Sequence, residues 1–152
     1  MVIRRASPED IKTLQDLNGE LLADNSKYDP DLKLEWSLSD DGQKYFTEAL
    51  DNPNSVCLIA EENGKPVGYI SATPREYGYR QSKYMEIDNM EVVADFRSKG
   101  IGSQLIDECL KIAREKGYQR AHVNAYYANT GAVNFYERGG FKRIDISLEK
   151  DL

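Results

Sequence analysis

The spacing of apolar residues along the chain predicts four helices. Residues 11–22 carry leucine and isoleucine at helical intervals behind Ser7-Pro8, a pair that is typical of a helix start. A second helix is expected from a Ser39 cap to residue 50, and a short one over residues 130–138. Between these lies a strongly periodic stretch that opens at two glycines, and its apolar positions are Ile101, Leu105, Cys109 and Ile112.

Runs rich in β-branched and aromatic residues predict strands between the helices. Asn63-Gly64 separates two of these runs and is typical of a two-residue hairpin turn. The expected strands cover residues 2–5, 56–60, 67–72, 84–94 and 122–126, and the tail from residue 141 to residue 152 is expected to be β-rich. The alternation of helices and strands, without a repeat or a linker, predicts one α/β domain over residues 1–152 with a mixed sheet.

The composition is that of an ordinary globular chain, and it excludes several classes of protein. Of the 152 residues, 40% are hydrophobic and 30% are charged, and no apolar run has membrane-spanning length. Cys57 and Cys109 lie in apolar segments without metal-type spacing, and the first residues lack the apolar stretch of a signal peptide. We therefore expect buried, reduced thiols, a cytoplasmic protein and no membrane partner.

Most of the net charge of −6 falls in one segment. Between Glu20 and Asp41 there are seven acidic residues and two lysines. The acidic balance argues against nucleic-acid binding, which needs a basic face. The segment is either an acidic wall that attracts a cationic ligand or a solvated loop with acidic helix caps.

The stretch from Arg97 to Gly102, "RSKGIG", places cations and glycines where a helix begins. A P-loop would need GxxxxGK followed by Ser or Thr, and the dinucleotide fingerprint would need a glycine at Leu105, so both motifs are excluded. What remains is a helix start whose unpaired amides and dipole favour an anion, with glycines that allow a diphosphate to approach. Taken alone, this motif fits a plain strand-to-helix turn equally well.

Two motifs together resemble the GCN5-related N-acetyltransferase (GNAT) family. "MEVVADFRSKGIGSQLI" resembles its coenzyme A signature, R/Q-x-x-G-x-G/A after a strand, and "NTGAVNFYERGGF" resembles its N-x-x-A-x-x-F-Y-x-x-x-G-F motif. The chain departs from the pattern at Ala94, Ser98 and Gly139, and Ser98 matters only if it needs a positive φ. Over nearly the whole chain, the resemblance implies a mixed, mostly antiparallel sheet with a splayed central strand pair and helices on both faces.

The resemblance implies acetyl-CoA as co-substrate. In the family, the strand before the signature splays at a bulge and exposes its backbone to the pantetheine arm, which by position is Met90–Val92. The amides of Ser98–Ser103 would hold the pyrophosphate, and Asn129 would bond the pantetheine chain or cap the next helix. The implied coenzyme-binding residues are Met90, Glu91, Val92, Arg97, Ser98, Lys99, Gly100, Ile101, Gly102, Ser103, Asn129 and Tyr136.

The implied reaction is direct acetyl transfer to a primary amine in a ternary complex, which needs a proton acceptor. An alkylammonium has a pKa of about 10.4, so roughly one molecule in 2,500 is nucleophilic at pH 7. Glu86 lies where some family members carry a glutamate base, and an interior position would make it a stronger base. A salt-bridged or edge carboxylate is the alternative, and Asp88, on the same face by strand alternation, is the reserve candidate.

Tyr136 is expected near the coenzyme sulfur, where the matching tyrosine of the family helps the thiolate to depart. Complete proton transfer from a phenol to such a thiolate is uphill by roughly 2 kcal/mol, so a hydrogen bond is favoured. The alternative is a core aromatic beside Phe135. His122, the only histidine, is expected to be structural, and no metal site is expected.

The resemblance also makes the acidic segment the expected wall of the acceptor site. Tyr28, Asp29, Glu35 and Trp36 are the predicted substrate-binding residues, and they suit a cationic amine such as a polyamine, an aminoglycoside or a basic peptide. The alternative functions are a non-catalytic acyl-CoA-binding or regulatory module of the same fold and an unrelated phosphate-binding protein. A homodimer is left open.

Overall fold

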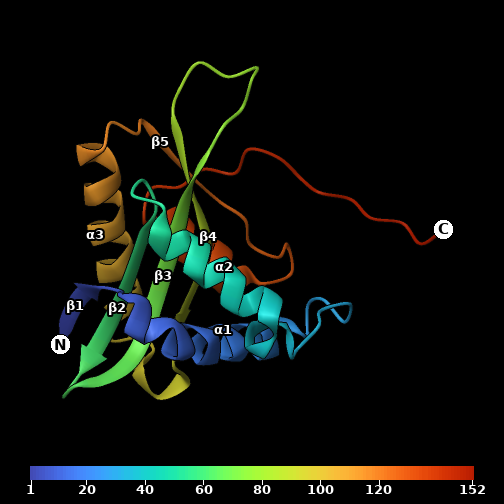
Figure 1. Cartoon of the computed structure of the whole chain (residues 1–152). Helices are drawn as coiled ribbons and strands as arrows, with labels where there is room; N and C mark the ends of the chain where they lie inside the picture. The colour runs from blue at the N-terminus through green and yellow to red at the C-terminus, as the bar shows by residue number, and fades with distance from the viewer.

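A five-stranded sheet forms the centre of the protein in the computed structural model, which describes residues 1–152 (Figure 1). The strands are β1 (Val2–Arg5), β2 (Val56–Glu62), β3 (Lys65–Arg75), β4 (Tyr84–Val92) and β5 (Arg120–Val123), in that order across the sheet. Neighbours from β1 to β4 are antiparallel, whereas β4 and β5 are parallel. The predicted mixed, mostly antiparallel sheet is confirmed.

Helices cover both faces of the sheet. They are α1 (Ile11–Asn25), α2 (Asp40–Asp51), α3 (Ile101–Glu115) and α4 (Thr130–Arg138), with 3-10 turns η1 (Pro8–Asp10), η2 (Trp36–Leu38) and η3 (Ala94–Phe96). Figure 1 shows α3 on one side of the sheet and α1 and α2 on the other. The predicted Ser39 cap is present, since its hydroxyl accepts from the Gly42 amide at 3.2 Å. No helix is both long and apolar enough to cross a membrane.

Each face of the sheet carries its own hydrophobic core, because successive strand residues point to opposite faces. In β2, Leu58 and Ala60 enter the core under α3, whereas Cys57 and Ile59 enter the core under α1 and α2. Cys57 and Cys109 are both buried free thiols, as predicted, and burial raises the pKa of each to about 12. The hairpin turn also follows the prediction, with positive φ at both Asn63 and Gly64.

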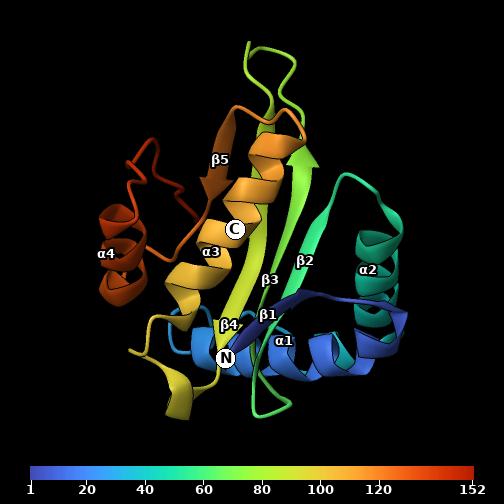
Figure 2. The same ribbon diagram turned by 90° about the vertical axis from the view of Figure 1, so that its left-hand side faces the viewer.

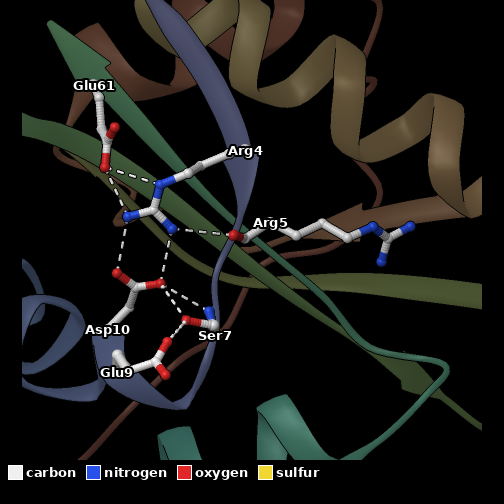
Figure 3. A network of polar contacts seen from close by, with 6 residues as sticks. All are labelled: Arg4, Arg5, Ser7, Glu9, Asp10 and Glu61. Atoms are coloured by element: carbon white, nitrogen blue, oxygen red, sulfur yellow. Dashed lines mark hydrogen bonds and ion pairs between the residues drawn. The ribbon is translucent and has the colours of Figure 1, made fainter. Parts of the chain in front are cut away.

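Arg4 joins three elements near the start of the chain (Figure 3). Its guanidinium donates to Asp10 at 2.8 and 2.9 Å and to Glu61 at 2.7 and 2.9 Å, which ties β1 to η1 and to β2. Asp10 also accepts from the Ser7 amide at 2.8 Å. Hydrogen bonding from Arg4 lowers the pKa of Asp10 to about 2, so this network holds the entry to α1 at neutral pH.

Two predictions about strands are wrong. β5 ends at Val123, so residues 124–126 follow it as irregular chain. The tail after Phe141 forms no strand, and no backbone group from Lys142 to Leu152 has a backbone hydrogen-bond partner. The physical reason is that a strand needs a neighbour to pair with, and the tail leaves the body of the molecule (Figure 1).

Candidate active site

β4 and β5 part midway along β4. Their parallel pairing ends at Ile87 and Val123. The antiparallel register with β3 shifts at the same place and leaves Asp88 as an extra residue in a β-bulge. Beyond it the β5-facing edge of β4 has no strand partner, and Met90–Val92 lie in this open part. The splay therefore starts at Asp88, just before the segment Met90–Val92 whose backbone the sequence expects to be exposed.

The chain between β4 and α3 makes a turn with left-handed backbone at two positions. Ser98 has φ +61° and Gly100, the N-cap residue of α3, has φ +82°. The amides of the first helical turn that follows lack intrahelical acceptors. Gly102 has a packing reason as well, since a Cβ there would lie 3.2 Å from the ring of Phe135 on α4. The glycines thus shape the turn and seat α4, besides leaving the main chain accessible.

Arg97 joins this turn to β4 and to α1. Its Nη2 donates to the carboxylates of both Asp24 and Glu91, and its Nε donates to the Val92 carbonyl at 2.8 Å. The Glu91 side chain is only 5% exposed, and this burial raises its pKa to about 7 despite the opposing effect of Arg97. Asp24 is engaged by Arg97 and is therefore not a free member of the acidic wall.

The two candidate bases differ in their partners. Glu86 is buried and accepts from Arg75 at 2.6 Å, with His122 Nδ1 at 3.6 Å, so it is held in an ion pair. Asp88 is exposed at the bulge and accepts from the hydroxyls of Thr73 at 2.8 Å and Tyr45 at 3.0 Å.

Partial removal from water raises the pKa of Asp88 above its ordinary value, and the two hydroxyl donors act in the opposite direction. A carboxylate of this kind is reachable and more basic than a free one. Asp88 therefore suits proton acceptance better than Glu86, whose lone pairs face a guanidinium.

Tyr136 lies on the α3 side of the sheet. Its ring packs against Phe135 and Phe141, with centroids 5.4 and 5.6 Å away, so the alternative of a core aromatic describes part of its role. Tyr136 and Ser103 also line one hollow of about 310 Å³ between α3 and α4. Burial, with a smaller contribution from the charge of Glu91, raises the pKa of the Tyr136 phenol to about 12.

Asn129 caps α4, where its Oδ1 accepts from the Ala132 amide at 3.1 Å. The sequence left a cap and a ligand contact open for this residue, and the cap is present. A side-chain amide that caps through its oxygen keeps its NH2 group for a second partner.

The acidic segment lies against the chain that follows β5. The Tyr28 and Tyr126 rings stack with centroids 6.0 Å apart, and the Tyr126 hydroxyl donates to Asp29 at 2.9 Å. Trp36 lies 5.9 Å from the ring of Tyr45, whose hydroxyl reaches Asp88. Tyr28 and Asp29 therefore lie against the chain that follows β5, and Trp36 lies beside the tyrosine that bonds Asp88.

Glu35, the fourth predicted acceptor residue, is exposed before η2 and has no side-chain hydrogen-bond partner in the structure. Sequence reasoning missed four residues that position the others, namely Tyr45, Thr73, Arg75 and Tyr126. Thr73 and Arg75 could have been found by pairing the two strands that flank the loop at residues 76–83, because that register sets them near Asp88 and Glu86. Tyr45 and Tyr126 carry no local signal.

The opening between β4 and β5 connects two chemically different faces. The left-handed turn, the start of α3 and Tyr136 lie with the core on the α3 side, whereas Asp88 bonds Tyr45 of α2 on the other side. No group of three or more His, Cys, Asp or Glu side chains is arranged to hold a metal ion. These features define an α/β protein with an opening in its sheet. On one side of the opening lies a helix N-terminus that can bind an anion, and on the other side lies a face that carries carboxylates.

Residues 19–141, most of the chain, match the Acetyltransferase (GNAT) family. The protein therefore belongs to this family. It is 28% identical over 150 residues to an aminoalkylphosphonate N-acetyltransferase of Salmonella typhimurium, covering 99% of this chain and 90% of that protein. It is 29% identical over 103 residues to an uncharacterised N-acetyltransferase of Methanocaldococcus jannaschii, covering 67% of this chain and 46% of that protein. The chain thus spans about half the length of some curated relatives it matches.

Solved structures share the fold. A mutant of the BH1408 protein from Bacillus halodurans superposes with a TM-score of 0.84 at 22% identity, covering 100% of this chain and 99% of that one. The aminoglycoside N-acetyltransferase AAC(6')-Iy in complex with CoA superposes with a TM-score of 0.76 at 19% identity, covering 99% and 98%. The predicted GNAT-like fold is confirmed.

Proposed function

We propose that this protein transfers the acetyl group of acetyl-CoA directly to the primary amine of a cationic acceptor in a ternary complex. The observation that carries the proposal is the opening of the sheet at Asp88. It connects the N-terminus of α3, which favours an anion, on one face with a surface of carboxylates and aromatic rings on the other. Such an opening lets a thioester from one face meet an amine from the other without a covalent enzyme intermediate.

The residues present fit the coenzyme. The amides from Ser98 to Ser103 would bind the pyrophosphate at the positive end of α3, where a left-handed turn precedes the helix. The edge of β4 at Met90–Val92 has no strand partner, and its backbone groups other than the Val92 carbonyl, which accepts from Arg97, would pair with the amides of the pantetheine arm like an added strand. Lys99 supplies positive charge beside the turn, whereas Arg97 is paired with Asp24 and Glu91 and holds the turn against β4. Asn129 keeps its NH2 group for the arm.

Asp88 is the proton acceptor for the attacking ammonium in this proposal. It accepts the proton directly or through a water, since it is exposed at the opening and its pKa is raised above the ordinary aspartate value. Tyr45 and Thr73 orient the carboxylate by donating to it. Glu86, which the sequence favoured, stays paired with Arg75 and supports the strand beside the opening.

Tyr136 donates a hydrogen bond to the departing thiolate. With its pKa raised to about 12, complete transfer of its proton to a thiol of pKa about 8.5 would be uphill by about 5 kcal/mol. The phenol therefore stabilises the developing charge by a hydrogen bond and keeps its own proton. The thiolate then takes a separate proton from solvent.

The residues that bind the acceptor in this proposal are Tyr28, Asp29, Glu35 and Trp36. Tyr126 and Trp36 offer aromatic faces to a cation, and the carboxylates of Asp29 and Glu35 offer ion pairs. Lys27 Nζ lies over the Tyr28 ring, 5.1 Å from its centroid, so Tyr28 contributes by stacking on Tyr126. A polyamine, aminoglycoside or basic peptide fits this surface. An aminoalkylphosphonate, the acceptor class named for one relative, carries an anionic group that the same carboxylates repel.

The decisive experiment is a thiol-release assay with acetyl-CoA and a panel of amines, accompanied by calorimetric binding of acetyl-CoA. We expect turnover with cationic acceptors and little with aminoalkylphosphonates or neutral amino acids. Binding without thiol release across the panel would support the non-catalytic module, and tighter binding of ATP than of acetyl-CoA would overturn the coenzyme assignment.

The acceptor surface is tested by Asp29→Asn combined with Glu35→Gln. This pair should raise KM for a cationic acceptor about tenfold or more, with a smaller effect at high salt, and leave the Kd of acetyl-CoA unchanged. The amide oxygen introduced by Asp29→Asn would still accept from Tyr126, so the loop keeps its contact. Asp16→Asn on α1 combined with Glu48→Gln on α2 is the matched control, because both side chains are exposed outside the acidic segment and the net charge changes equally.

The base is tested by comparing Asp88→Asn with Glu86→Gln. Asp88→Asn should lower kcat by about 100-fold or more and remove the acidic limb of the pH profile, whereas Glu86→Gln should leave that limb in place. The reverse ranking would return the role to Glu86.

A further inference from the structure

The loop between β3 and β4, residues 76–83, carries tyrosine rings and arginine side chains that pack on one another. Figure 2 shows the loop projecting beyond the ends of the helices. The guanidiniums of Arg75 and Arg80 lie over the Tyr77 ring, 5.4 and 5.1 Å from its centroid. The centroid of the Tyr84 ring lies 4.9 Å from that of Tyr77. This packing gives the segment Arg75–Tyr84, which we call the arginine–tyrosine hairpin, a defined surface.

Two arginines at the base of the hairpin have no carboxylate partner. Nη1 of Arg80 donates to the Tyr84 hydroxyl at 2.5 Å, and Arg120 is the register partner of Tyr84 on β5. The hydrogen bond from Arg80 lowers the pKa of Tyr84, and the charge of Arg120 acts in the same direction. Glu76, the one acidic residue of the loop, forms no ion pair with either arginine. Both guanidiniums are therefore available to a ligand.

A pair of unpaired guanidiniums suits an acidic side chain. Each guanidinium presents a planar set of N–H donors that matches the two oxygens of a carboxylate. Two positive charges beside the same hydroxyl repel each other, and an anion bound between them relieves this repulsion. The chain as a whole has a net charge of −6, whereas residues 75–83 contain three cations and one acid. The hairpin is thus a positive region of an acidic protein, and charge complementarity favours an acidic ligand there.

The hairpin continues the face of the sheet that carries Asp88. Thr73 and Arg75 are two residues apart on β3 and therefore point to the same face. Thr73 donates to Asp88 at 2.8 Å and Arg75 donates to Glu86 at 2.6 Å, so these side chains form a strip from the opening to the hairpin. Four residues of β4 separate Asp88 from Tyr84, which is about 13 Å at the spacing of a strand. An acceptor that contacts both places must span this distance.

We propose that the arginine–tyrosine hairpin binds an acidic side chain of a peptide acceptor whose N-terminal amine lies at Asp88. This inference rests on the proposed function and selects, among its acceptors, a peptide with a cationic beginning and an acidic residue further along. An extended peptide advances about 3.3 Å per residue, so its fifth residue lies about 13 Å from the amine. A polyamine has no acid to place at the hairpin, and an aminoalkylphosphonate is too short to reach it.

The test uses the full-length protein and three peptide amides, each with a free N-terminal amine and arginine at the second position. One has eight residues with glutamate at the fifth and sixth positions, one has glutamine at both, and one ends after the third residue. Fluorescence anisotropy of C-terminally labelled peptides gives their Kd in the presence of CoA, which has no acetyl group to transfer. The glutamate peptide should bind about tenfold more tightly than the glutamine peptide at low salt, with a smaller difference at high salt.

Arg80→Gln combined with Arg120→Gln should abolish this preference. Both side chains are exposed, so the variant should keep the wild-type circular dichroism spectrum. Lys12→Gln on α1 combined with Lys111→Gln on α3 is the matched control, since both lysines are exposed and the net charge changes equally. The control should keep the preference. Thiol release with the three-residue peptide and acetyl-CoA should be the same in the wild type and in both double variants, because this peptide does not reach the hairpin.

The outcomes separate the hairpin site from the proposed function. Equal binding of the two long peptides by the wild type would overturn the hairpin site, and this comparison needs no variant to fold. A preference that persists without Arg80 and Arg120 would also overturn it. A preference in binding without thiol release from any peptide would refute acetyl transfer and support the hairpin site. Thiol release from all three peptides without any preference would support the transfer and overturn the hairpin site.

Discussion

Ser98 is a serine held in left-handed backbone, and replacing it with glycine should stabilise the protein. Its φ of +61° lies where an L-residue other than Asn or Asp is strained by about 1–2 kcal/mol. Glycine removes this strain but loses about 0.5–1 kcal/mol to the greater entropy of the unfolded chain. The net gain expected for Ser98→Gly is therefore about 0.5–1 kcal/mol, or about 1–4 °C in Tm for a chain of this size.

The matched control is Ser103→Gly, which makes the same substitution at an exposed position of α3. Right-handed helical backbone gains nothing from glycine, so this variant should lose about 0.5 kcal/mol. Urea unfolding of both variants without ligand measures the difference, and the opposite signs separate backbone strain from loss of a hydroxyl.

The coenzyme affinity provides a second readout for Ser98→Gly. Because the residue would contribute its amide and not its side chain, the Kd of acetyl-CoA should stay within about twofold. A Ser98→Gly variant that is equally or less stable than the wild type would refute the strain argument, and a large loss of affinity would show that the hydroxyl itself binds.

Three further predictions concern the two faces of the opening. Tyr136→Phe should lower kcat by about ten- to a thousand-fold in steady-state thiol release, with little change in the Kd of the coenzyme. If turnover is unchanged while chemistry is rate-limiting, Tyr136 serves only as a core aromatic residue. Gly100→Glu should weaken acetyl-CoA binding by about 100-fold or more in calorimetry, whereas Gly100→Asn, which tolerates a φ of +82° and adds no charge, should bind within about tenfold. For Glu91 the folded pKa of about 7 lies above the unfolded value near 4.5, so its contribution to stability is complete below about pH 4.5 and is lost as the pH rises through about 7. Between about pH 5 and pH 8, the free energy of unfolding of Glu91→Gln should therefore fall by about 2 kcal/mol less than that of the wild type, as measured by urea unfolding. The same pH dependence in both proteins would contradict the raised pKa.

The elements that depend on neighbouring residues could be read from the sequence. The helical stripe from Ile101 to Ile112, the Ser39 cap and the turn at Asn63-Gly64 all depend on residues at most about four positions apart, and each occurs as predicted. The two motifs also identify the family without any tertiary contact, because the spacing of their residues is itself the signal. Local periodicity and turn chemistry are properties of the sequence alone.

The arrangement of the candidate site was decided by tertiary structure. Tyr45 reaches Asp88 across 43 positions and Tyr126 reaches Asp29 across 97, and no local pattern announces either bond. Only the tertiary structure places the β-bulge at Asp88, because the register of β4 against β3 depends on residues far apart in the sequence. The tail after Phe141 also shows that tertiary structure decides. Its residues alternate as in a strand, but a strand forms only where another strand offers its hydrogen-bonding edge, and the tail has no such neighbour.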